Sequence, residues 1–264
     1  MEDLISLVTH PSRYLGEEIN IIKKDLTQVS LSICLAFPDV YEIGMSHLGL
    51  HILYHLLNAR RDVAAERVYA PGLDMEQVLR EKSRKLTSLE STCPVDRFDL
   101  LGFSFQYELS YTNIVNMLDL ASIPLYASQR SETFPLIIGG GPCAFNPEPL
   151  ADFFDAFVIG DGEEVMLEIS DCVIRAKSEG VSKKDLLYSL SRIEGVYIPS
   201  LFEVCYEDNG TVQDIIPLTK DYQRVNKRWV QSLDDAPFTD SPLVPYKQIV
   251  HDRLNLEIAR GCTR

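Results

Sequence analysis

The final residues of the sequence place a single cysteine directly after an apolar segment. Residues 257–264 read Glu-Ile-Ala-Arg-Gly-Cys-Thr-Arg, the pattern of a strand that leads into a glycine loop carrying Cys262. A thiolate in such a loop can bind a metal or an iron–sulfur cluster, but a cluster needs several thiolates. The remaining cysteines show neither CxxC nor CxxxC spacing: Cys34, Cys93, Cys143, Cys172 and Cys205. Because chain termini are usually polar, this ending predicts the front portion of a longer protein.

Two glycine-rich turns follow apolar segments, at Gly139-Gly140-Gly141 and at Gly160-Asp161-Gly162. Residues 139–144 formally fit the dinucleotide fingerprint GxGxxA, which requires a helix to begin at the turn. Pro147 would fall inside that helix, where proline removes a hydrogen-bond donor and clashes with the preceding turn. A triple glycine before a proline-rich loop instead lets a bulky planar ligand lie against the backbone. A tight turn that binds no ligand is the alternative interpretation.

Three histidines, His47, His51 and His55, recur every four residues and would share one face of a helix. At a rise of ~1.5 Å per residue, the first and third are about 12 Å apart along the axis and cannot reach one ion. A pair could bind a metal, but the intervening residues lack the glutamate of a zinc-protease helix. The pattern favours a helix face that lies against a linker or a partner domain. His47 stays a candidate site residue because it opens the helix.

The composition limits the classes of function. The chain has 264 residues, 39 acidic and 25 basic, with a formal net charge of −14. No block of Lys and Arg is dense enough to follow phosphates, so we do not expect direct binding of nucleic acid. No apolar run approaches the ~20 residues of a membrane span, and the acidic N-terminus is untypical of a signal peptide. Cysteines without an export signal predict a cytoplasmic protein.

Segments of strand and helix type alternate along the first 195 residues. Strands are expected at residues 31–37, 67–70, 99–104, 134–138 and 156–159, and helices at 48–57, 75–86, 111–121 and 163–177. Five strands that alternate with helices predict an α/β fold with a doubly wound parallel sheet, like a Rossmann fold. In such a fold ligands bind at the carboxyl ends of the strands.

The pattern changes after residue 195. Apolar segments at 196–206 and 212–218 flank Asp208-Asn209-Gly210, a strong signal for a β-hairpin. Residues 221–248 are proline-rich and predict a linker that packs on the domain through Phe238, Leu243 and Tyr246. Residues 254–258 alternate in polarity and predict the first strand of a next domain. We therefore expect an α/β domain at 1–195, a hairpin and linker at 196–250, and the start of a further domain at 251–264.

The turns together resemble the cobalamin-binding domain that precedes the radical SAM domain in a large group of enzymes. That family carries Asp-x-His-x-x-Gly after the first strand, Ser-x-Leu after a later strand, Gly-Gly after the fourth, and commonly a Gly-x-Gly-Glu turn. This sequence has Asp-Val-Tyr-Glu-Ile-Gly at 39–44, Ser-Phe-Gln at 104–106, Gly-Gly at 139–140 and Gly-Asp-Gly-Glu at 160–163. The resemblance implies these cofactor-binding residues: Asp39, Tyr41, Gly44, Ser104, Gly139, Gly140, Gly141, Gly160, Gly162 and Glu163.

The sequence departs from this family at Tyr41. The family histidine supplies an axial nitrogen to cobalt, whereas a neutral phenol with a pKa of about 10 is a poor ligand. Two alternatives follow. Either a corrinoid binds without histidine ligation, or the domain kept the fold and lost the cofactor.

A longer stretch, residues 37–50, reads Phe-Pro-Asp-Val-Tyr-Glu-Ile-Gly-Met-Ser-His-Leu-Gly-Leu and resembles the N-terminal part of an uncharacterised radical SAM group. In that superfamily Cys262 would be the first cysteine of CxxxCxxC, whose three thiolates hold a [4Fe-4S] cluster and leave one iron open for S-adenosylmethionine. The resemblance implies an enzyme that cleaves S-adenosylmethionine to a 5′-deoxyadenosyl radical in a C-terminal radical SAM domain, a truncated partial barrel here.

The reaction of that enzyme depends on the corrinoid. With a corrinoid the expected chemistry is methyl transfer to an unreactive carbon; without one, hydrogen abstraction leading to rearrangement or thiolation is expected. The substrate, whether a small molecule or a macromolecule, is not given by the resemblance. The alternative is a non-catalytic, Rossmann-like module that recognises a substrate or a partner. The 264 residues alone are expected to be inactive, because their cluster loop is incomplete.

Overall fold

The computed structural model of the chain describes residues 2–131, 134–253 and 255–261. Its main element is a six-stranded sheet in the order β2-β1-β3-β4-β5-β6. The strands are β1 (Leu31–Phe37), β2 (Val63–Tyr69), β3 (Leu100–Ser104), β4 (Leu136–Gly140), β5 (Ala156–Val158) and β6 (Val196–Tyr197). β1 to β5 are parallel, and β6 pairs with β5 in the antiparallel sense. The predicted α/β fold is confirmed.

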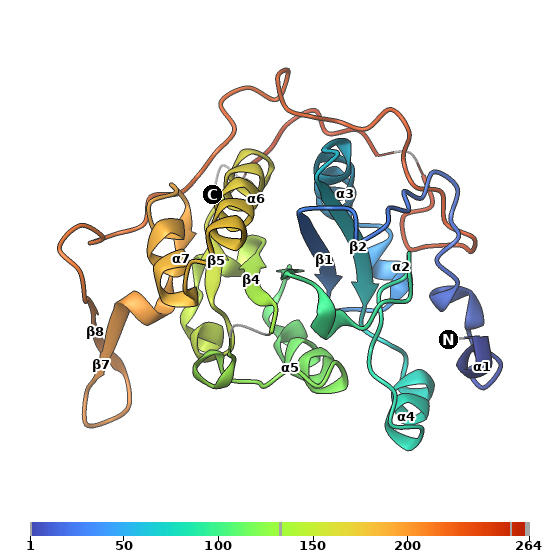
Figure 1. Cartoon of the computed structure of the whole chain (residues 1–264), viewed down its shortest axis with the longest axis horizontal. Helices are drawn as coiled ribbons and strands as arrows, with labels where there is room; N and C mark the ends of the chain where they lie inside the picture. The colour runs from blue at the N-terminus through green and yellow to red at the C-terminus, as the bar shows by residue number, and fades with distance from the viewer. Residues whose placement is uncertain (1, 132–133, 254, 262–264) are drawn as a thin grey trace.

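Helices cover both faces of the sheet, as the term doubly wound requires (Figure 1). One face carries α3 (Leu48–Ala59), α6 (Glu163–Glu179) and α7 (Lys183–Leu190), and the other carries α4 (Leu73–Glu81) and α5 (Tyr111–Leu120). The side chains of β1 alternate between the two cores: Leu35 packs with the first group of helices and Cys34 with the second. All seven residues of β1 are buried, as expected for a central strand between two layers.

The helices follow the predicted segments with small shifts. The helix expected at residues 75–86 spans Leu73–Glu81, because Ser83 has a φ of 50° and leaves the helical region. Two short helices, α1 (Glu2–Ile5) and α2 (Tyr41–Gly44), lie before β1 and directly after it. Neither α7 nor α2 was predicted as a helix from the sequence. No helix among the described residues has both the length and the apolar character needed to cross a membrane.

The outer edge of β2 is covered by side chains and by a neighbouring loop. Lys24 donates from Nζ to the carbonyl oxygen of Val63 over 2.6 Å. The Asn58 side chain forms two hydrogen bonds with the backbone of Ala65, at 2.8 and 3.1 Å. The backbone of Arg67 donates to Glu90 over 2.7 Å and accepts from the Leu89 N–H over 2.8 Å. As a result, all seven residues of this edge strand are buried.

The predicted hairpin is confirmed in part. β7 (Phe202–Tyr206) and β8 (Val212–Pro217) pair in the antiparallel sense around the Asn209-Gly210 turn, where Gly210 has a φ of 84°. The strand expected at residues 196–206 is divided, however: residues 196–197 form β6 in the main sheet. A 3-10 turn at Pro199–Leu201 separates the two pieces, because proline has no N–H for a strand ladder.

The segment after the hairpin crosses the domain without a helix or a strand between residues 218 and 253. Its course runs past α6 and α3 to the N-terminal segment, drawn in orange and red in Figure 1. Leu243 is buried, Val244 forms an isolated bridge with Ile19, and Arg228 forms one with Gly160. Phe238 and Tyr246, which we expected to pack, remain about half exposed.

The strand predicted at residues 254–258 is not observed at the described residues 255–258. A strand needs a neighbour to satisfy its N–H and C=O groups, and no described strand pairs with this segment. Leu254 is outside the described residues.

Candidate functional site

A cavity of about 350 Å³ opens at the carboxyl edge of the sheet. The connection from β1 places α3 on one face of the sheet, and the connection from β3 places α5 on the opposite face. The chain therefore reverses its winding direction between β1 and β3, and such switch points form crevices in which ligands bind. The volume is in the range of small-molecule sites.

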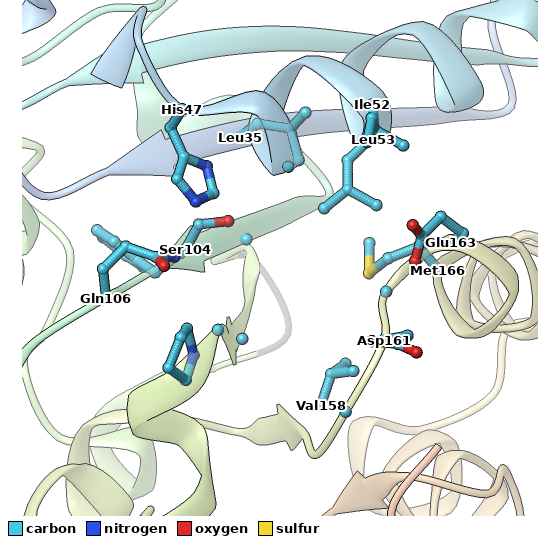
Figure 2. Close-up of a pocket in the computed structure, with 18 of the residues that line it drawn as sticks. Leu35, His47, Ile52, Leu53, Ser104, Gln106, Val158, Asp161, Glu163 and Met166 are labelled. Atoms are coloured by element: carbon cyan, nitrogen blue, oxygen red, sulfur yellow. The ribbon is translucent and has the colours of Figure 1, made fainter. Parts of the chain in front are cut away.

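The inner part of the cavity is apolar. It is formed by residues from β1, α3, β3, β4, β5 and α6: Leu35, Ile52, Leu53, Phe103, Ile138, Val158 and Met166. Figure 2 shows several of these side chains between two polar groups that lie at opposite ends of the cavity. A ligand in this space would bury apolar surface against these side chains.

Five of the glycines that line the cavity fall into two groups. Gly141 and Gly160 have φ values of 106° and 121°, and an added Cβ would lie 2.5 Å from the Phe105 oxygen and 1.9 Å from the Arg228 oxygen, respectively. At Gly139 an added Cβ would lie 2.8 Å from the rings of Phe105 and Phe157. The fold therefore requires glycine at all three positions, because of the positive φ at residues 141 and 160 and because of the aromatic rings at residue 139.

Gly102 and Gly140 form the second group, on the neighbouring strands β3 and β4. An added Cβ at Gly140 would have no heavy atom closer than 4.0 Å, and at Gly102 none closer than 3.6 Å. Neither glycine has a positive φ. Glycine inside a strand lowers stability and often marks close approach of a ligand. The fold does not require these two glycines, which leave an open surface on the sheet.

One end of the cavity carries His47, Ser104 and Gln106 (Figure 2). His47 is the N-cap of α3, and its Nδ1 accepts a hydrogen bond from the Leu50 N–H over 3.1 Å. Burial lowers the pKa of His47, an effect that hydrogen bonding with the Gln106 side chain opposes. The ring is therefore neutral at pH 7. It also lies beside the Phe37 ring, with 5.1 Å between centroids.

The other end carries the carboxylates of Asp161 and Glu163, which Arg260 bridges. Nη2 of Arg260 donates to Glu163 over 2.6 Å and to Glu257 over 2.7 Å. Nη1 lies 3.4 Å from Asp161. Hydrogen bonding with Glu257 and Glu163 raises the pKa of Arg260, so the guanidinium stays charged.

The linker also holds the turn that carries these carboxylates. The Asp161 N–H donates to the Arg228 oxygen over 3.0 Å, and Val230 N–H donates to the Asp161 carboxylate over 2.8 Å. Arg228 further pairs with Glu164 and Glu168 of α6, at 2.6 and 2.7 Å. The position of the turn after β5 therefore depends on residues 228–230.

The structure brings most of the predicted cofactor-binding residues together. Those that line the cavity are Ser104, Gly139, Gly140, Gly141, Gly160, Gly162 and Glu163. Asp39, Tyr41 and Gly44 are not among the lining residues. Asp39 accepts a hydrogen bond from the Tyr107 hydroxyl over 2.9 Å. Cys262 lies outside the described residues.

Tyr41 lies in the core rather than at the cavity. Helix α2 turns it inward, where it is 1% exposed and packs edge to face on Tyr69, with 5.5 Å between centroids. An added Cβ at Gly44 would lie 2.2 Å from the Tyr69 ring, so this glycine is needed for the same packing. Burial raises the pKa of Tyr41, which keeps the phenol neutral.

The other two histidines do not line the cavity. His51 is 9% exposed, and burial lowers its pKa to about 3. Within the described ranges, no group of three or more His, Cys, Asp or Glu side chains is placed to hold a metal ion.

Several cavity residues were missed from the sequence: Gly102, Gln106, Asp161 and Arg260. Side chains two positions apart in an extended chain point to the same face. That rule places Gly102 and Gln106 with Ser104, so it would have found two of the four. Arg260 had no such signal, because its contact with Glu163 is made only by the fold.

Known proteins resemble this chain over part of its length. An uncharacterized protein of Methanocaldococcus jannaschii is 25% identical over 142 residues, which are 52% of this chain and 26% of that protein. The radical S-adenosylmethionine methyltransferase TsrM from Kitasatospora setae is 16% identical with a TM-score of 0.38, over 68% of this chain and 29% of that one. The cobalamin-dependent S-adenosylmethionine radical enzyme OxsB, with aqua-cobalamin and S-adenosylmethionine bound, is 14% identical with a TM-score of 0.41, over 77% and 27%.

The chain thus spans about a quarter of the length of these proteins. The family model described as radical SAM proteins, N-terminal, matches residues 49–199. These residues include β2 to β5, most of α3 and the two glycine turns of the cavity. Because the match covers more than half of the chain, the protein belongs to this family of radical SAM proteins, of which it carries the N-terminal domain.

Proposed function

We propose that this chain is the cofactor-holding N-terminal part of a radical SAM iron–sulfur enzyme, and that its cavity receives the flat nucleotide base of a corrinoid. The observation that carries the proposal is the open sheet surface at Gly102 and Gly140, which the fold itself does not require. A flat heteroaromatic ring can lie against such a surface, while the apolar residues around it exclude water.

The residues that line the cavity fit the base of this cofactor, and Tyr41 would not be among the residues that hold it. Tyr41 faces Tyr69 in the core and not the cavity. Residues of the cavity would hold the base through packing on its face and through the polar groups at each end. When bound, the corrinoid would supply methyl transfer, and the cluster with S-adenosylmethionine would supply the 5′-deoxyadenosyl radical.

The corrinoid part of the proposal is tested by titrating the chain with hydroxocobalamin and with cobinamide, which lacks the nucleotide tail. We expect hydroxocobalamin to bind more tightly than cobinamide. Gly140→Val should weaken its binding by at least about tenfold, because the new side chain would fill the cavity. Tyr41→Phe serves as the control and should leave binding unchanged. Equal binding of hydroxocobalamin and cobinamide, or no effect of Gly140→Val, would show that the nucleotide base does not bind in this cavity.

Absence of hydroxocobalamin binding to the unchanged chain would favour the other hypothesis, a substrate- or partner-binding module that kept the fold without the cofactor. The volume and the apolar lining of the cavity are compatible with a planar substrate as well. Isothermal titration with candidate planar substrates would then replace the corrinoid titration.

The enzyme part of the proposal is tested separately in the full-length protein. After anaerobic reconstitution with iron and sulfide, it should cleave S-adenosylmethionine to 5′-deoxyadenosine. Cys262→Ala should remove the cluster absorbance and this cleavage, whereas Cys205→Ala, on the hairpin, should remove neither. The 264-residue chain alone should hold no stoichiometric cluster. A cluster that survives Cys262→Ala would contradict the assignment.

A further inference from the structure

The start of α3 determines which ring nitrogen of His47 carries the proton. Nδ1 accepts a hydrogen bond from the Leu50 N–H over 3.1 Å, so it has no proton of its own. A neutral imidazole then carries its proton on Nε2. The N-cap role of His47 thereby turns its second nitrogen into a donor and removes the lone pair that a metal would need.

The Gln106 side chain lies at the same end of the cavity as the His47 ring (Figure 2). Hydrogen bonding with the Gln106 side chain opposes the fall in the His47 pKa, and the atom of a Gln side chain that accepts a hydrogen bond from Nε2–H is its carbonyl oxygen. The amide nitrogen then points the other way. In agreement, this nitrogen lies 3.1 Å from the position of an added Cβ at Gly141, on the glycine wall of the cavity.

We propose that Gln106 is a specificity-determining residue that presents its amide N–H to an acceptor atom of the ligand, and that His47 is the positioning residue that fixes this orientation. The hydrogen bonds would run in one direction, from Leu50 through His47 and Gln106 to the ligand. The preferred ligand is a planar heteroaromatic ring with an unprotonated ring nitrogen or a carbonyl at this end. This inference depends on the proposed function only where the ligand is a corrinoid. The benzimidazole of a corrinoid has such an acceptor nitrogen when that nitrogen is not bound to cobalt.

The opposite end of the cavity does not offer the same recognition. Asp161 and Glu163 present carboxylate oxygens there, and the charged Arg260 guanidinium lies against both of them. This end is therefore charged, whereas the end with His47 and Gln106 is neutral, and the neutral end suits the acceptor atom of an uncharged ring. His47, in this scheme, binds neither cobalt nor another metal.

The first test needs no ligand. In protein labelled with ¹⁵N-histidine, long-range ¹H–¹⁵N spectra at neutral pH should show an unprotonated Nδ1 and a protonated Nε2 for His47. The resonance is assigned by its loss in His47→Asn, a substitution that keeps a good N-cap residue. A protonated Nδ1, or a doubly protonated ring, would overturn the proposal whether or not a corrinoid binds.

The second test uses benzimidazole and indole as probes. The two bicyclic rings have the same shape, but only benzimidazole has an acceptor nitrogen. We expect the unchanged chain to bind benzimidazole roughly tenfold more tightly than indole, the difference that one hydrogen bond provides. Gln106→Met, which keeps the length of the side chain and removes the donor, should abolish this preference. Equal binding of the two rings to the unchanged chain, or no binding of either, would overturn the proposal.

Two further variants separate positioning from stability. His47→Asn should lose most of the preference for benzimidazole with little change in the melting temperature, and combining it with Gln106→Met should cause no further loss. His55→Asn, on the same helix but away from the cavity, should behave like the unchanged chain. Additive losses would overturn the positioning role. Benzimidazole binding without hydroxocobalamin binding would contradict the corrinoid assignment and support the role of Gln106.

Discussion

Arg260 donates from Nη2 to Oε1 of Glu163 over 2.6 Å, although the two residues are 97 positions apart. The Glu163 side chain is 6% exposed and that of Arg260 is 25% exposed, so the pair is largely shielded from water. Glu163 is the first residue of α6 and lines the cavity, and Arg260 lies two residues before Cys262. This contact attaches the segment at residues 255–261 to the cavity.

Replacing Glu163 with Gln should loosen that segment, because a neutral amide holds a guanidinium less strongly than a carboxylate does. Trypsin should then cleave after Arg260 about fivefold faster, as expected for a loss on the order of 1 kcal/mol. Glu164→Gln is the matched control, since Glu164 pairs with Arg228 and not with Arg260. Equal cleavage rates in the two variants would show that the Arg260–Glu163 contact does not hold the segment.

Arg67 is fully buried between two carboxylates, 2.6 Å from Glu90 and 3.0 Å from Glu18. Arg67→Met would leave both carboxylates buried without their cation. We expect the free energy of unfolding to fall by about 3–5 kcal/mol in urea denaturation. Arg60→Met, which breaks more exposed ion pairs, should cost less than about 1 kcal/mol. Comparable losses would mean that burial does not determine the contribution of Arg67.

His51 should make the fold sensitive to acid. Its pKa falls to about 3 in the folded chain because of burial and the nearby Arg67 charge, against about 6.5 in the unfolded chain. Below pH 6.5 the unfolded chain therefore binds a proton that the folded chain does not, and stability decreases as the pH falls. Between pH 8 and 5 the loss from this group should be about 2 kcal/mol.

The measurement is the free energy of unfolding against pH for His51→Leu and the unchanged chain. The difference in the free energy of unfolding between His51→Leu and the unchanged chain should change by about 2 kcal/mol between pH 8 and 5. His10→Asn, at an exposed position, is the control. Parallel curves for all three proteins would contradict the predicted role of His51.

Gly140→Ala and Gly139→Ala should affect stability in opposite directions. The methyl group at residue 140 would enter the cavity without a close contact, so the strand should gain about 0.5–1 kcal/mol. At residue 139 it would lie 2.8 Å from two aromatic rings, and we expect a loss of about 1–3 kcal/mol. Thermal unfolding of both variants measures this, and a loss at residue 140 equal to that at 139 would mean that the fold needs both glycines.

The order of the strands in the sheet was not predicted from the sequence, but the parallel α/β sheet could be, because each of its buried strands is a short apolar segment that ends in a turn. β6 could not, since its two residues form a strand only through pairing with β5. The cavity glycines of the two turns, at residues 139–141 and 160–162, were predicted, whereas Gly102, which lies within β3, was not. The position of Tyr41 was not, because helix α2 and the Gly44–Tyr69 contact, which turn it into the core, depend on tertiary packing. Arg260 likewise joins the cavity only through a contact between distant segments.

The hydrogen bonds on the outer edge of β2 have a consequence for association between molecules. An edge strand with free N–H and C=O groups is a template on which the strand of another chain can pair. Here Lys24, Asn58 and Glu90 already occupy the groups of Val63, Ala65 and Arg67 that such a strand would use. Strand addition on this side would first have to break these hydrogen bonds, so a second copy of the chain that associates along this edge would have to use side-chain contacts.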